Sequence, residues 1–158
     1  MIPIIGDNYN FRTPIMKLIT QINELYQIGK YDEVIACSLR SIFDLAIFEL
    51  TVNKIEFTNK SLEDQTKDLI NWINGQNKRL EEISKRLKYT QLKNEIQIAD
   101  FKNTISICHL GAHKATQSIS RKDIEKVGKD CATFVCIVNE LLNSPHVTFL
   151  NGPNKIKI

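Results

Sequence analysis

The sequence has little glycine, proline or aromatic content, and no long hydrophobic run. Six glycines and four prolines in 158 residues exclude a collagen-like or low-complexity chain. No apolar stretch approaches the roughly 18 residues that a membrane span needs, so we expect no membrane association. The first residues are too few and too uncharged for a secretory signal. We therefore expect a cytoplasmic protein, either free or as one domain of a longer chain, whose 42% hydrophobic residues form one core.

No Cys-x-x-Cys spacing is present, although the chain has four cysteines. All four lie within segments of apolar helical spacing: Cys37, Cys108, Cys131 and Cys136. This placement predicts reduced thiols in the core rather than disulfides or metal ligands. We expect neither a metal nor a cofactor.

Charge of one sign is also scarce overall, since 21 basic and 18 acidic residues give a net charge of only +3. The exception is the segment 67–93, where seven basic and three acidic side chains give +4. Its candidate nucleic-acid-binding residues are Lys78, Arg79, Lys85, Arg86 and Lys88. Together with Trp72 and Tyr89 they are candidates to bind a phosphate backbone and stack on bases. The alternative is a solvated helical face with ion pairs four residues apart, and it is the favoured interpretation.

Apolar residues recur with helical spacing between the two tails, residues 1–12 and 144–158. The predicted helices span 13–29, 32–53, 61–75, 98–112 and 120–143, with 77–97 either a separate helix or an irregular linker. This pattern predicts an all-α, four- to five-helix up-and-down bundle over 13–143, with short irregular or β-like tails.

The segment 32–53 is apolar on nearly all sides, which predicts the central helix of the bundle. Its narrow polar stripe includes Arg40 and Asp44, which we interpret as an ion pair four residues apart; the alternative is a polar groove that meets His113. Apolar residues beyond the need of one core, on this helix and at Ile107, Cys136 and Ile137, predict a homodimer.

Two histidines, His109 and His113, stand four residues apart beside Cys108. This spacing suits two metal ligands on one helix, but Gly111 between the histidines indicates a helix end. The better functional interpretation is a lone His113 that acts as a general acid or base. The structural interpretation, in which His109 flanks the core and His113 caps a helix end, is favoured over both. Cys–His nucleophilic catalysis is weaker still, because nothing marks Cys108 as a thiolate.

The order of three motifs resembles that of the HEPN superfamily of prokaryotic helical domains. The motifs are Cys37-Ser-Leu-Arg40-Ser-Ile-Phe-Asp-Leu-Ala-Ile-Phe-Glu, then Leu110-Gly-Ala-His113, then Ile119-Ser-Arg-Lys-Asp123. The resemblance covers residues 13–143. It implies a helical bundle that often dimerises, in a family that includes metal-independent ribonucleases of toxin–antitoxin and phage-defence systems and many non-catalytic modules.

The ribonuclease motif of that family has an arginine four to six residues before the histidine. This chain has Ser106, Ile107 and Cys108 before His113 and lacks that arginine. We therefore expect a non-catalytic binding and dimerisation module in a nucleic-acid-related, phage-defence system. Its expected partners are a second copy, RNA and associated or fused domains. The alternatives are a toxin-like ribonuclease that uses His113 with another cation, and a purely structural assembly domain.

Overall fold

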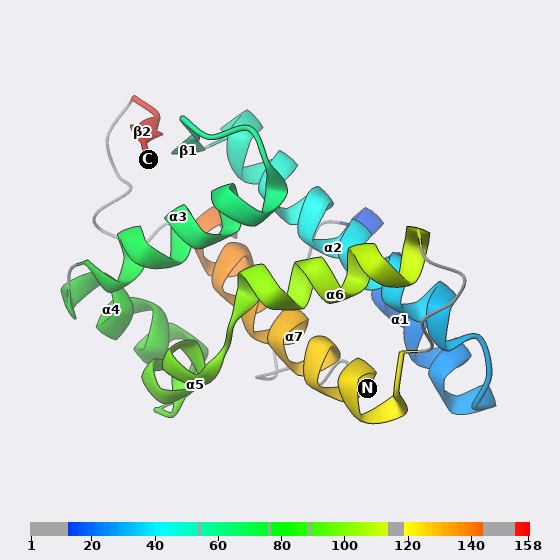
Figure 1. Cartoon of the computed structure of the whole chain (residues 1–158). Coiled ribbons are helices and arrows are strands. Elements are labelled where there is room, and N and C mark those ends of the chain that lie inside the picture. Colours follow the sequence, from blue (N-terminus) through cyan, green and yellow to red (C-terminus); the bar gives the residue numbers. More distant parts are fainter. Residues whose placement is uncertain (1–12, 54, 76, 89, 114–118, 144–153) are drawn as a thin grey trace.

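The computed structural model describes residues 13–53, 55–75, 77–88, 90–113, 119–143 and 154–158. Within these ranges it contains seven helices and two very short strands (Figure 1). The helices are α1 (Thr13–Ile28), α2 (Asp32–Asn53), α3 (Leu62–Asn74), α4 (Asn77–Leu87), α5 (Leu92–Ile98), α6 (Phe101–His113) and α7 (Arg121–Asn143). The predicted all-α bundle is confirmed.

The helix ends follow the local signals in the sequence. Gly29 ends α1 with φ 76°, a left-handed conformation that glycine adopts without steric cost. Ser61 caps α3, because its Oγ accepts a hydrogen bond from the Asp64 backbone N–H at 3.2 Å. Ser120 Oγ accepts the equivalent bond from the Asp123 N–H at 3.1 Å and caps α7. These caps set where the central helices begin and end.

The central position predicted for α2 is confirmed. It contacts α1, α3, α6 and α7, most extensively α7 and α6. Leu39, Ile42 and Phe43 on its inner side are completely buried. The Phe43 ring packs on that of Phe134 from α7, with the ring centroids 5.0 Å apart. Figure 1 shows α6 running across the front of the bundle, with α2 and α7 behind it.

Residues 77–97 form two helices, α4 and part of α5, rather than one helix or a linker. The chain turns after α4 at Lys88, whose φ is 51°. Both helices bury leucine or isoleucine side chains in the common core, among them Leu80, Ile83 and Leu92. The basic segment is therefore part of the packed bundle.

A two-residue parallel sheet joins the end of the chain to the segment that follows α2. Strand β1 (Ile55–Glu56) pairs with β2 (Ile156–Lys157), and Ile55 lies opposite Ile156. The Lys155 ammonium also donates a hydrogen bond of 2.6 Å to the Thr51 carbonyl in the last turn of α2. The β-like character predicted for the C-terminal tail is present in these residues, while the N-terminal tail 1–12 lies outside the described residues.

The apolar surplus predicted on the last helix is inside the monomer. Cys136 and Ile137 of α7 are almost completely buried, and Ile107 packs partly buried against the core. Cys136 and Ile137 do not support a dimer surface, because they belong to the core that α7 forms with α2, α4, α5 and α6. In the described part of the chain no helix is long and apolar enough to cross a membrane.

Candidate functional site

Exposed large hydrophobic side chains of the described structure gather on and next to α2. The large hydrophobic residues with the greatest exposure are Ile28, Tyr31, Val34, Phe48 and Val52. Three of them lie on α2, where Val34 is 49% exposed, Phe48 62% and Val52 54%. The other two are Ile28, the last residue of α1, and Tyr31, directly before α2.

These side chains lie on one stripe of the helix. Steps of four, three, four, three and four residues join Val34, Ser38, Ser41, Leu45, Phe48 and Val52. Alternating steps of four and three residues are the spacing of the side chains with which two helices pack along one another. We call these six residues the outer face of α2. All of them are exposed or half-buried, and the buried residues of α2 lie on its opposite side.

The two serines of the outer face present little unsatisfied polarity. Ser38 Oγ donates to the Val34 carbonyl at 2.8 Å, and Ser41 Oγ donates to the Cys37 carbonyl at 3.4 Å. Because each hydroxyl already bonds its own helix, covering these serines does not leave a donor without an acceptor. The face therefore combines three exposed apolar side chains with two small serines whose hydroxyls are already bonded.

A second cluster joins α2 to α6 through Arg40. Its Nη1 lies 3.4 Å from His109 Nδ1 and 4.0 Å from Glu63 Oε1, and its Nε lies 3.9 Å from Asp44 Oδ2. The predicted Arg40–Asp44 pair is present, but the Asp44 side chain is 56% exposed, so this is not a buried pair. Partial burial nevertheless raises the pKa of Asp44, an effect that Arg40 opposes.

On α6 the Arg40 guanidinium contacts His109, one helical turn before His113. The predicted groove that meets His113 stays a prediction. His113 is the last residue of α6, and its side chain lies outside the described residues. The sequence carried no local signal for the Arg40–His109 contact, because the two residues are 69 positions apart. Within the described residues no group of three histidine, cysteine or acidic side chains is placed to hold a metal ion.

Cys108 is buried beneath this cluster. Burial raises the pKa of its thiol to about 12, so the thiolate is scarce at neutral pH. None of the four cysteines is in a disulfide, and Cys37 is only half-buried, in contrast to the core position predicted for it. The site therefore offers an imidazole and a guanidinium but no activated sulfur.

The structure separates the cations of the basic segment. The Arg79 guanidinium stacks on the Trp72 ring at 4.0 Å and donates to the Trp72 carbonyl at 2.6 Å, so both residues are engaged within the bundle. Lys85 and Lys93 line a shallow surface pocket between α4 and α5. Arg86 is exposed. Burial raises the pKa of the Glu140 carboxyl, and the positive charge of Arg86 opposes this rise.

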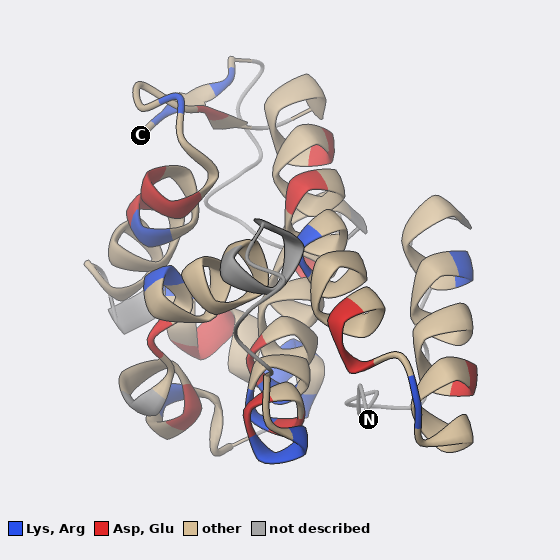
Figure 2. Cartoon of the chain, turned by 45° about the vertical axis from the view of Figure 1, so that its right-hand side comes forward, with Lys and Arg blue, Asp and Glu red and all other residues tan. Residues whose placement is uncertain are grey.

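Of the predicted cations not yet discussed, the structure describes the side chain of Lys88. Lys88 is exposed at the end of α4. The Lys78 side chain and Tyr89 lie outside the described residues. Figure 2 shows basic and acidic segments interspersed on the helices. The charge excess of the sequence is therefore distributed over several surfaces.

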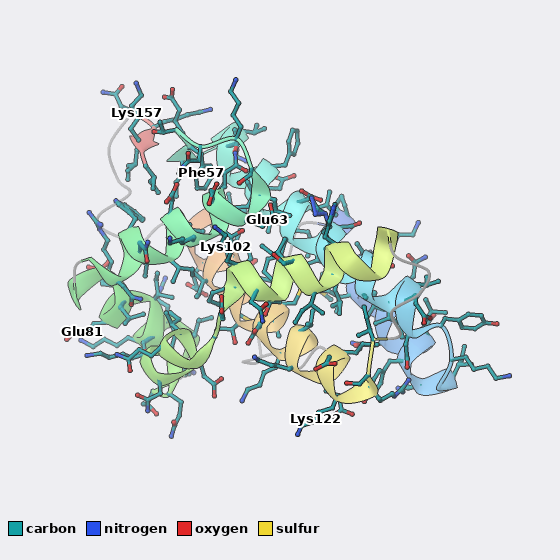
Figure 3. All side chains as sticks on the ribbon, in the orientation of Figure 1. Phe57, Glu63, Glu81, Lys102, Lys122 and Lys157 are labelled. Carbon is teal, nitrogen blue, oxygen red and sulfur yellow. The ribbon has the colours of Figure 1, made fainter. Side chains whose placement is uncertain are left out.

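An amphipathic groove of about 560 Å³ lies between α3 and the junction of α5 with α6. Lys67 and Lys102 lie on its opposite walls, with Asn71, Asn74 and Gln97 along its length. The Lys102 ammonium is 3.6 Å from the Asp64 carboxylate, an exposed pair of small energetic weight. Figure 3 labels Lys102 and Glu63 where α3 and α6 pass each other. The groove is too close to neutral to attract a polyanion by charge alone.

Comparisons of the chain with protein-family models, with curated proteins and with solved structures found no match.

Proposed function

We propose that the protein is a homodimerising helical module whose self-association surface is the outer face of α2. The observation that carries this proposal is the alignment of exposed Val34, Phe48 and Val52 on one helix of an otherwise well-packed bundle. Exposed apolar side chains that form a continuous stripe are typical of an interface, whereas single ones are common on any surface. The resemblance to the HEPN superfamily supports the same proposal.

Light scattering tests this function directly. At tens of micromolar protein we expect twice the 18.2 kDa mass of one chain. Phe48→Asp places a charge in the middle of the buried contact and should give the monomer mass with an unchanged circular dichroism spectrum. Asn94→Asp adds the same charge on exposed α5 and should remain dimeric. A monomeric wild-type protein contradicts the proposal.

We further infer that the module acts in the cytoplasm in a nucleic-acid-related system and contacts RNA weakly through α4 and α5. Lys85 and Lys93 support this, since both are exposed and line one pocket between α4 and α5, and Lys88 is exposed at the end of α4. Affinity for single-stranded RNA should fall as salt rises, and more steeply in wild type than in the Lys85→Gln/Lys88→Gln variant. Equal affinities of the two proteins, or an affinity independent of salt, contradict this role.

The second candidate function is metal-independent cleavage of RNA, and the Arg40–His109 contact is the observation that favours it. Such cleavage needs a base for the 2′-hydroxyl and a cation for the phosphate. Here Glu63 and Asp44 share the Arg40 guanidinium, which weakens its attraction for a phosphate. We therefore expect no cleavage of single-stranded or structured RNA in excess chelator. Cleavage that disappears in Arg40→Ala and in His109→Ala or His113→Ala supports the ribonuclease instead.

A further inference from the structure

The outer face of α2 is complementary to itself when two copies lie antiparallel. In that orientation Val34 of one copy lies level with Val52 of the other, Ser38 with Phe48, and Ser41 with Leu45. All three pairs share one midpoint, the level of residue 43, so a single two-fold axis satisfies them together.

The sizes of the paired side chains favour this orientation. Each of the two largest residues, Phe48 and Leu45, lies opposite a serine, and the two medium-sized valines lie opposite each other. Large residues facing small ones allow two helices to interdigitate at the usual 8–10 Å separation. A parallel pair would instead set Phe48 against Phe48 and Ser38 against Ser38, which forces the helices apart at one level and leaves a gap at another.

The charged flank of the helix does not select the orientation. A two-fold antiparallel axis brings the flank that carries Arg40 and Asp44 next to the same flank of the partner. Arg40 and Asp44 of one copy then each lie two residues from the level of Asp44 in the other copy, so attraction and repulsion offset each other. The orientation therefore rests on the pairing of side-chain sizes.

We propose that two copies of this chain associate through antiparallel packing of their α2 helices, with Phe48 of each copy seated over Ser38 of the other. This inference rests on the proposed homodimerisation and adds the orientation and register of the contact. The occupant of the face is a second copy, because the pairing of large with small side chains arises from the face itself.

Variants with one introduced cysteine distinguish the two orientations, because the remaining Cys108, Cys131 and Cys136 are buried. In a Cys37→Ser background, Val34→Cys and Val52→Cys are near-isosteric changes at the two ends of the outer face. In the antiparallel pair, the two copies of residue 34 are 18 residues apart along the helix axis, roughly 27 Å. A short bis-maleimide should therefore cross-link a mixture of the two variants, and neither variant alone.

The outcomes separate this inference from the proposed function. Cross-linking of Val34→Cys with itself, at or above the yield of the mixture, overturns the antiparallel register but leaves the dimer intact. A protein that is dimeric by light scattering but forms no cross-link in any combination overturns the assignment to α2. A monomer by light scattering overturns both. Asn94→Cys in the same background is the matched control and should not cross-link with either variant.

Discussion

Truncation of Phe48 should weaken the dimer without weakening the fold. The side chain is 62% exposed in the single chain, so the bundle itself gains little from it. A buried aromatic side chain covers about 200 Å², so about 120 Å² of Phe48 is left for a partner. At about 25 cal/mol per Å² this corresponds to about 3 kcal/mol for each copy.

Alanine retains part of the buried area, so each copy loses only part of this free energy. The loss counts twice, because both copies in the dimer carry the substitution. We therefore expect Phe48→Ala to cost about 4 kcal/mol of association free energy, which raises the dimer Kd roughly a thousandfold. Sedimentation equilibrium over a range of concentrations measures this Kd. Chemical unfolding of dilute, monomeric protein should show a change below about 0.5 kcal/mol, as is usual for a surface substitution.

Phe43→Ala is the matched comparison, because it makes the same change on the opposite side of the same helix. Phe43 is completely buried against Phe134, so this variant should lose about 3–5 kcal/mol of unfolding free energy. If Phe48→Ala destabilises the dilute monomer as much as Phe43→Ala does, or leaves the Kd unchanged, the outer face of α2 is not the contact surface.

Three further results are expected. Leu39→Ala, at a completely buried position of α2, should lower the free energy of unfolding of the monomer by about 2–5 kcal/mol in urea titrations, and a change below 1 kcal/mol would contradict the central placement of α2. Asp130→Asn should raise the melting temperature at pH 7. Burial raises the pKa of the Asp130 carboxyl, so ionisation of this group lowers the stability of the fold above the pKa that it has in the unfolded state. The advantage of asparagine should therefore vanish below about pH 4. Dimerisation should strengthen as ionic strength rises from low to moderate, because α2 has four acidic residues and one arginine and salt screens the repulsion between two such helices. If light scattering shows that salt weakens the dimer, ion pairs dominate the contact.

The sequence predicted most helix boundaries because their signals are local. Ser61 and Ser120 cap the helices expected to begin there, and Gly29 ends the first helix. The central position of α2 was also predictable, since a helix that is apolar on most sides must be buried on most sides. These features depend on residues within one or two helical turns of each other.

What the sequence did not reveal depends on packing between distant segments. Helical spacing shows that α2 is apolar nearly all round, but the neighbouring helices determine that Phe48 is exposed and Phe43 is buried. A signal for the outer face was present, because a 3.5-residue stripe of apolar and small residues runs beside the core positions. The contact between Arg40 and His109 had no such signal, since it depends on where α6 crosses α2.

The small sheet bears on the order in which the chain folds. Pairing of β1 with β2 closes a loop of roughly 100 residues, an entropic cost of about 4 kcal/mol before any compensation. Its few hydrogen bonds contribute about 1 kcal/mol each, including that from the Ile158 N–H to the Glu56 carbonyl. The pairing is therefore favourable only after the helices have brought these segments together. It forms late in folding and opens first, so the amide of Ile158 should exchange with solvent long before those in the middle of α2.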